Sequence, residues 1–350
     1  MKLFFVLAIS MICCPSLPAA TSVKMLQLPG NAGMIGDVVV DPVGQIHAVW
    51  LQADAVFYAV SSDEGKSFSA PVQISPANEG ASGGMFRGPQ MSLDRDATIH
   101  VVWYPDQSKL PDKKDWGVRY ARLLKGAGKF SDAVNLGQIP SDNYSVAADG
   151  KGQVAVVWTS GDVYVTLSKN EGESFDQPQK IAGLDPCQCC ATASYFDANG
   201  KLALLYRDKR NDDRNVFLVF DVLNASNQRI QLNEENWKIN ACPIAGHSLV
   251  MLPQSGFVAG WEEKGSAFLS LSSSMTTPPR QILLGTGKYP RVLVLSDGTV
   301  FAGWKQGSDT LWKTFDMAGT ELASGKVGAT PSSAKFGAAL SSKGVVLVTP

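Results

Sequence analysis

The sequence predicts an all-β protein, and three features of its 350 residues lead to this prediction. First, one pattern recurs six times: an apolar strand, a turn rich in Asp and Gly, and a second apolar strand that ends in an aromatic residue, at Trp50, Trp103, Trp158, Tyr206, Trp261 and Trp304. Second, these aromatic residues are 43 to 55 residues apart. Third, no amphipathic stretch of three helical turns interrupts the series. Regularly spaced hairpins are typical of a β-propeller, in which each blade is a four-stranded sheet.

Each unit has the composition that a buried hairpin requires. In the unit 146–158, for example, both strands are rich in Ala and Val, and the turn 149–152 contains an Asp and two Gly. Glycine allows the positive φ that tight hairpin turns need. A second hairpin follows most units, as in 55–74 and 162–181, so that a unit supplies four strands. A shortened copy, 338–348, brings the number of first hairpins to seven.

This count favours seven blades, and six is the alternative if the terminal pieces complete one blade differently. The last copy supplies only two strands, whereas the segment 23–30 near the N-terminus resembles the outer strands of other units. We expect this segment to pair with the C-terminal blade, because a closed ring leaves no open sheet edge. Residues 21–350 are therefore predicted to form a single propeller domain.

Residues 1–20 are predicted to be a secretory signal peptide. Lys2 precedes the apolar run 3–14, and the small residues Ala19 and Ala20 supply a cleavage site. The apolar run is too short to span a bilayer. We therefore expect a periplasmic or secreted protein without a transmembrane segment.

The charge balance restricts the class of partner. The chain has 31 Lys and Arg against 32 Asp and Glu, a net charge of −1, and only 18% of its residues are charged. Nucleic-acid binding requires clustered Lys and Arg, so we expect no nucleic-acid partner. The hydrophobic fraction of 45% excludes a disordered chain. We expect a compact monomer with a small-molecule or glycan ligand.

Two second hairpins carry a turn motif that resembles the Asp-box, or BNR repeat, of the sialidase superfamily, Ser-x-Asp-x-Gly-x-Thr/Ser-Phe/Trp. The segment 61–68 matches every key position, and the segment 168–175 matches with Asn in place of Asp. A carboxylate or amide in such a turn accepts hydrogen bonds from the main chain, Gly supplies a positive φ, and Phe packs beneath the hairpin. The residues that we expect to have these structural roles are Asp63, Gly65, Phe68, Asn170, Gly172 and Phe175. The resemblance implies a sialidase-like propeller, with these boxes on the face opposite to the active site.

Blade topology predicts which other residues share that opposite face. If the strands of each blade run from the innermost to the outermost, the second turns and the connections between blades lie at the same end. Propellers bind ligands at the mouth that such loops form. The residues expected there are Met34, Met85, Phe86 and Arg87, the loop 106–116, Asn143 and Tyr144, Cys187 to Cys190, the loop 207–215, Cys242, Glu262 and Glu263, and Tyr289 to Arg291.

The resemblance to sialidases implies roles for some of these residues. Sialidases bind the substrate carboxylate with three arginines, pair a Tyr nucleophile with a Glu, and use an Asp as the acid and base. By loop position, the corresponding residues are Arg87, Arg207 and Arg291 for the carboxylate, Tyr289 and Glu262 for the nucleophile pair, and Asp106 for the acid. Trp116 lies outside the repeat position of the other tryptophans and could stack on the sugar.

This resemblance implies a sialic-acid-type ligand and a retaining exo-α-sialidase. Two departures favour a descendant that binds the glycan without hydrolysing it. Gly88 stands where the Phe-Arg-Ile-Pro motif of the family has Ile, and the segment 86–89 follows the first Asp-box instead of preceding it.

The cysteines support a different hypothesis. Cys187, Cys189 and Cys190 lie in the connection into the fourth blade, Cys242 lies in the connection into the fifth, and His247 follows. Thiolates and an imidazole suit copper(I) or zinc, and the thioethers of Met34 and Met85 would extend a copper(I) site. The chain would then be a periplasmic metal-binding or redox protein.

Disulfides are the alternative arrangement of these cysteines, because exported proteins with an even number of cysteines usually oxidise them. A bridge between Cys242 and one member of the triplet is then expected. A second bridge within the triplet would be strained, since close neighbours rarely meet the required geometry.

Overall fold

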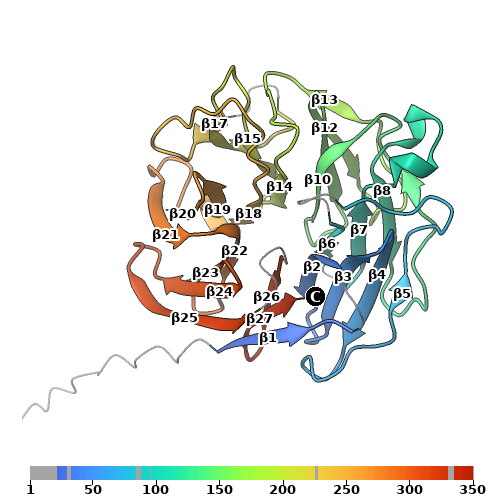
Figure 1. Cartoon of the computed structure of the whole chain (residues 1–350), viewed down its shortest axis with the longest axis horizontal. Helices are drawn as coiled ribbons and strands as arrows, with labels where there is room; N and C mark the ends of the chain where they lie inside the picture. Colours follow the sequence, from blue (N-terminus) through green and yellow to red (C-terminus); the bar gives the residue numbers. More distant parts are fainter. Residues whose placement is uncertain are drawn as a thin grey trace, which may run out of the picture.

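The computed structural model is a seven-bladed β-propeller with its blades arranged in a ring around a common axis (Figure 1). Among the described residues, six sheets have four strands and the seventh has three. The prediction of an all-β propeller with seven blades is confirmed. The residues that the structure describes are 22–29, 33–83, 88–94, 96–224, 228–329 and 335–349.

The predicted signal peptide, residues 1–20, lies outside the described residues. Within the described part of the chain, no helix is long and apolar enough to cross a membrane.

Strand order within each four-stranded blade follows chain order from the channel outward. The innermost strands are β2 (Met34–Val40), β6 (Gln90–Leu93), β10 (Asp142–Ala148), β14 (Ala193–Phe196), β18 (His247–Met251), β22 (Lys288–Val294) and β26 (Gly337–Ser341). The second strands are β3 (Ile46–Gln52), β7 (Ile99–Trp103), β11 (Val154–Ser160), β15 (Leu202–Arg207), β19 (Phe257–Glu263), β23 (Val300–Gln306) and β27 (Gly344–Thr349). These seven pairs are the hairpins that the repeat predicts.

The outer strands complete the blades. The third strands are β4 (Ala55–Ser61), β8 (Arg119–Leu123), β12 (Asp162–Ser168), β16 (Val216–Phe220), β20 (Ser266–Ser272) and β24 (Asp309–Phe315). The fourth strands are β5 (Val72–Gln73), β9 (Val134–Asn135), β13 (Gln179–Ile181), β17 (Gln228–Gln231), β21 (Arg280–Thr286) and β25 (Glu321–Ala329). Three short 3₁₀ helices lie in loops: η1 (Gln107–Lys109), η2 (Lys113–Asp115) and η3 (Pro253–Ser255).

The N-terminal strand β1 (Val23–Gln27) closes the ring. It pairs with β27 in parallel, from Val23 opposite Val345 to Gln27 opposite Thr349, and the two strands lie side by side in Figure 1. The pairing continues for one more residue, because the N–H of Leu28 donates to the carbonyl oxygen of Thr349 over 3.0 Å. The expected closure by the N-terminal segment is confirmed.

The apolar core lies between adjacent blades. The aromatic residues near the ends of the second strands are almost inaccessible, with exposed fractions of 0% for Trp50, Trp158 and Trp261. Trp261 of the fifth blade, for example, packs in one cluster with Leu205 of the fourth blade. Burying such large side chains between neighbours ties each blade to the next.

Side chains of the inner strands also join successive blades by hydrogen bonds. The Ser248 hydroxyl accepts a bond from the N–H of Val292 (3.0 Å), and the Asp37 carboxylate accepts one from the N–H of Met91 (3.2 Å). Asp37 and Ser248 occupy equivalent positions, since each pairs with the residue before the buried Trp of its second strand. The sequence repeat therefore reproduces one interblade contact in two parts of the ring.

The two turns with the Asp-box pattern join third to fourth strands and are built alike. In the first, the Asp63 carboxylate accepts bonds from the Ser61 hydroxyl (2.8 Å) and from the N–H of Ser67 (2.9 Å). In the second, the amide oxygen of Asn170 accepts the corresponding bonds. The remaining motif residues complete the turns: Gly65 and Gly172 have φ of 79° and 76°, and Phe68 and Phe175 pack against the blade cores.

Candidate functional site

Many of the candidate ligand-binding and cysteine residues lie toward one end of the propeller. The inner strands begin at this end, and the turns that join second to third strands lie there too, because neighbouring strands in each blade are antiparallel. We call this end the entrance face. The Asp-box turns join third to fourth strands and therefore lie at the opposite end.

Three inner strands contain a β-bulge close to the entrance face. The shifts in register lie between Ile35 and Asp37, between Asp142 and Ser145, and between Lys288 and Arg291. Two residues at these bulges, Asn143 and Tyr289, have positive φ of 42° and 58°. A bulge turns the following side chain in a new direction. Asp37, Ser145 and Arg291 come to equivalent positions beside the channel in this way.

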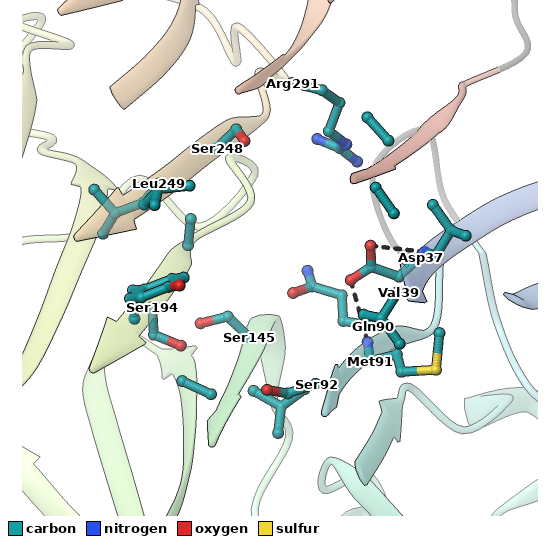
Figure 2. A pocket seen from close by; sticks show the side chains of 18 of the residues that line it. Asp37, Val39, Gln90, Met91, Ser92, Ser145, Ser194, Ser248, Leu249 and Arg291 are labelled. Atoms are coloured by element: carbon teal, nitrogen blue, oxygen red, sulfur yellow. Dashed lines mark hydrogen bonds between the residues drawn. The ribbon is translucent and has the colours of Figure 1, made fainter. Parts of the chain in front are cut away.

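A cavity of about 490 Å³ occupies the channel and is lined by residues of all seven inner strands. Figure 2 shows the Arg291 side chain extending into it from β22, with Asp37 and Gln90 on the facing side. Ser145, Ser194 and Ser248 add hydroxyl groups around the same space (Figure 2). The cavity therefore combines apolar strand surface with a few polar groups, as small-molecule sites do.

Two basic side chains, those of Arg291 and Lys335, line this cavity. The guanidinium of Arg291 has one described hydrogen bond, a long one of 3.4 Å to the carbonyl oxygen of Pro290. Lys335 is only 6% exposed, and burial together with the charge of Arg291 holds its pKa well below the usual range. These two groups repel each other, so an anion placed between them would be stabilised.

Asp37 is the one acidic residue among the described residues that line the cavity. Its carboxylate accepts main-chain N–H bonds from Val38 (3.0 Å) and Met91 (3.2 Å). Burial raises the pKa of Asp37, and the charge of Arg291 opposes that rise. The cavity is therefore more cationic than anionic when these side chains are charged.

Tyr289 and Glu262, the pair that sequence reasoning selected, lie next to each other. Tyr289 is 8% exposed and lines the cavity, whereas Glu262 is 5% exposed and is not among the residues that line it. Burial raises the pKa of Glu262 to about 7, against the lowering effects of Lys288, Arg207 and the main-chain N–H of Tyr289. The Lys288 ammonium is 3.9 Å from the carboxylate but is itself 57% exposed, so burial outweighs its charge.

Arg207 has a different environment from Arg291. It is 1% exposed and donates to two carbonyl oxygens at 2.5 Å, that of Arg214 and that of Glu262 in the next blade. Its guanidinium also lies 4.9 Å from the ring centre of Trp237. Arg207 therefore joins the fourth and fifth blades and does not line the cavity.

The remaining sialidase-type candidates lie away from the cavity or outside the described residues. Asp106 caps η1, where its carboxylate accepts bonds from the N–H and the hydroxyl of Ser108. The indole N–H of Trp116 donates to the carbonyl oxygen of Leu110 over 2.9 Å. Neither residue lines the cavity. Met85, Phe86 and Arg87 lie outside the described residues, and so does the side chain of Met34.

The four cysteines meet at the entrance face. Cys189 and Cys242 form a disulfide, which confirms the expected bridge between Cys242 and the triplet. Cys187 and Cys190 are free thiols with exposed fractions of 4% and 2%. The sulfur atoms of Cys187, Cys189 and Cys190 all lie within 4.8 Å of one another.

His247, the nitrogen ligand proposed from sequence, is 5% exposed and begins β18. Its Nδ1 bonds to the carbonyl oxygen of Ala191, and its buried Nε2 has no partner in the described part of the chain. Burial, then the charge of Arg207, lowers the pKa of His247 to about 3, so the ring is neutral near pH 7.

Comparisons with known proteins establish the fold and no more. The chain matches no protein-family model and no curated protein. A streptogramin B lyase structure aligns with a TM-score of 0.56 and 9% identity over 91% of each chain. An Aleuria aurantia lectin in complex with α-methyl-L-fucoside aligns with a TM-score of 0.53 and 10% identity, over 86% of this chain and 96% of the lectin. A leech intramolecular trans-sialidase aligns with a TM-score of 0.49 and 9% identity, over 84% of this chain and 68% of the trans-sialidase.

Sequence reasoning missed Asp37, Gln90 and Lys335. Asp37 and Gln90 pair with the residue before a buried Trp, as Arg291 does, so the repeat alignment could have identified them. Lys335 precedes the shortened last hairpin and has no counterpart in the repeat.

The raised pKa of Glu262 predicts a dependence of stability on pH. Its folded pKa of about 7 exceeds the ordinary value of 4.5, so its stabilising effect is complete below pH 4.5 and is lost as the pH rises through 7. The free energy of unfolding of Glu262→Gln, taken relative to that of the wild type, should therefore be higher at pH 8 than at pH 5. The expected difference between the two pH values is roughly 2–3 kcal/mol. Urea unfolding at both pH values measures this difference.

The control is Glu235→Gln, because the Glu235 side chain is 86% exposed. It should show no such change between pH 5 and pH 8. Equal pH profiles for Glu262→Gln and the wild type would contradict the assignment.

Proposed function

We propose that the entrance face binds a small ligand bearing a carboxylate, such as an acidic sugar, in the central channel. The observation that carries this proposal is the meeting of Arg291 and Lys335 in one cavity of about 490 Å³. A guanidinium offers rigid, charge-assisted donors that match a carboxylate, and partial removal from water strengthens the attraction. The main-chain bonds of Asp37 keep that carboxylate directed to its own blade and its neighbour.

The other polar groups of the cavity suit a sugar. The amide of Gln90 and the hydroxyls of Ser145, Ser194 and Ser248 can bond to ligand hydroxyl groups, and the apolar strand surface can contact a sugar ring. The fold likeness to a propeller lectin that holds a fucoside agrees with a sugar ligand. A sialic-acid-type ligand would combine the carboxylate and the hydroxyls.

Hydrolysis of a sialoside is the finer form of this proposal. Tyr289 lines the cavity and Glu262 lies against its main chain, so the nucleophile pair of a retaining exo-α-sialidase is available. A carboxyl group with a pKa of about 7 is suited to accept a proton near neutral pH.

Binding of N-acetylneuraminate should depend on Arg291. Replacing the guanidinium in Arg291→Gln removes charge-assisted bonds and should raise Kd at least about tenfold. Arg280→Gln, which removes an exposed arginine of β21, is the matched control and should leave Kd unchanged. Isothermal titration calorimetry measures both values.

The uncharged methyl ester of the same sugar separates carboxylate recognition from general sugar binding. It should bind the wild type as weakly as the acid binds Arg291→Gln, and equal affinity of acid and ester would refute the proposal. Turnover of a fluorogenic sialoside tests hydrolysis: activity that Tyr289→Phe abolishes supports a sialidase, and no activity in the wild type restricts the protein to binding.

A second candidate function is metal binding by the reduced cysteine cluster. Three sulfur atoms within 4.8 Å, two of them on buried thiols, favour copper(I) or zinc. Cys242 would add a fourth sulfur after reduction of the disulfide. Nε2 of His247 is buried and has no hydrogen-bond partner among the described residues. The disulfide agrees with a periplasmic or extracellular location, where thiols oxidise.

Reduced protein should bind one equivalent of copper(I) under anaerobic conditions, and Cys187→Ser should weaken binding at least about tenfold because a buried thiolate ligand is lost. Competition with a chromogenic copper(I) chelator measures the affinity. The disulfide form should bind more weakly than the reduced form. Equal affinities of the reduced wild type and Cys187→Ser would exclude this site.

A further inference from the structure

The turn 187–190 holds two free thiols against a disulfide. The Sγ atom of Cys187 lies 3.3 Å from Sγ of Cys189, which is bonded to Cys242, and 3.6 Å from Sγ of Cys190. Cys187 is therefore in contact both with a disulfide sulfur and with a second thiol. This arrangement places a nucleophile, its target and a resolving thiol in one cluster.

Main-chain bonds fix the turn in this geometry. The N–H of Cys190 donates to the carbonyl oxygen of Cys187 (3.2 Å), and the N–H of Cys187 donates to that of Arg207 (2.8 Å). The side chain of Gln188 accepts a bond from the N–H of Gly161 in the third blade (3.0 Å). The turn that carries the sulfur atoms is thus tied to the third and the fourth blade.

Position distinguishes the two thiols. The sulfur of Cys187 is 3.3 Å from the disulfide sulfur of Cys189, and the thiol of Cys190 donates a hydrogen bond to the sulfur of Cys187 over 3.6 Å. Cys187 is therefore placed to attack the disulfide, and Cys190 is placed to attack Cys187 afterwards.

The four cysteines differ in their exposure to solvent. Cys187 and Cys190 are buried, Cys189 is half-buried, and Cys242 is exposed. A protein or small molecule from outside can reach Cys242 more easily than the buried pair. Exchange with an external group is therefore favoured at Cys242.

From these observations we propose that the four cysteines form a thiol–disulfide relay, in which the buried Cys187 and Cys190 reduce the Cys189–Cys242 disulfide and deliver a thiol at the exposed Cys242. This activity is separate from ligand binding in the channel and requires no metal.

The relay has two balanced steps. In the first, the Cys187 thiolate attacks Sγ of Cys189; the Cys187–Cys189 bond forms, the Cys189–Cys242 bond breaks, and Cys242 leaves as a thiolate that takes a proton from water. In the second, Cys190 loses its proton and attacks Sγ of Cys187; the Cys187–Cys190 bond forms, and Cys189 leaves as a thiolate and is protonated. One disulfide and two thiols are present before and after, so the exchange consumes no oxidant.

The exchanged form has a reducing thiol pair, Cys189 and Cys242, at the surface. Its substrate class is an external disulfide: two electrons pass to that disulfide, which becomes two thiols, and the Cys189–Cys242 bond forms again. The protein then holds two disulfides, and a dithiol reductant is needed to restore the buried pair.

Alkylation of the native protein tests the internal exchange. Protein purified without added thiol is incubated with N-ethylmaleimide near pH 7 in the presence of a chelator, quenched with acid, digested without reduction and mapped by mass spectrometry. We expect N-ethylmaleimide on Cys242 together with a Cys187–Cys190 or Cys187–Cys189 disulfide. A map in which Cys242 stays bonded to Cys189 while only Cys187 and Cys190 are alkylated would overturn the proposal.

Two variants identify the path. Cys187→Ser removes the nucleophile and should lower the alkylation rate of Cys242 at least about tenfold, and an unchanged rate would overturn the relay. Cys190→Ser removes only the resolving thiol, so Cys242 should still be alkylated and Cys187–Cys189 should accumulate. Should Cys187→Ser fail to fold, Cys190→Ser decides the matter, because absence of the Cys187–Cys189 bond in it would refute the first step.

Discussion

Closure of the ring by β1 is the constraint on which the rest of the structure depends. Without it, the seventh blade would be the hairpin of β26 and β27, with an open edge along β27. The parallel pairing of β1 with β27 supplies the third strand of the seventh blade. It also packs the N-terminal segment against the first blade, where Leu26 and Trp50 share a core cluster. Because all seven inner strands bound the channel, closure sets the position of each. Lys335, directly before β26, lines this channel together with Arg291 of the neighbouring β22, whose charge acts on it.

The entrance face contains two centres that use arginine differently. Arg291 follows a bulge and extends into the channel, where its donors face the cavity. Arg207 is buried between blades, where main-chain carbonyls accept its bonds and its charge acts on the nearby thiols of Cys187 and Cys190. The first arrangement suits recognition of an anion from solution. The second suits stabilisation of a buried thiolate, which connects the joint between blades to the chemistry of the cysteine cluster.

The blades and their closure could be predicted from the sequence because strand periodicity and turn residues repeat along the chain. The different environments of Arg207 and Arg291 could not be predicted in this way. Arg207 ends the inner hairpin of its blade and Arg291 lies near the start of the inner hairpin of its own, and in the sequence the two positions look alike. What separates them is the bulge at Tyr289 and the carbonyl oxygens that surround Arg207. A bridge from Cys242 to the triplet followed from the count of cysteines, but the choice of Cys189 depends on the turn that Cys187 and Cys190 close.

Native-state hydrogen exchange, followed by mass spectrometry, tests the central claim that β1 holds the ring and its channel together. If β1 closes the ring, its amide groups should exchange as slowly as those of β26 and β22, through opening of the whole domain. Peptides covering Val23–Gln27 and Gly337–Ser341 should then lose protection together in increasing urea. Rapid exchange of β1 at zero urea, with β26 and β22 still protected, would show that the channel persists without closure and would contradict the account.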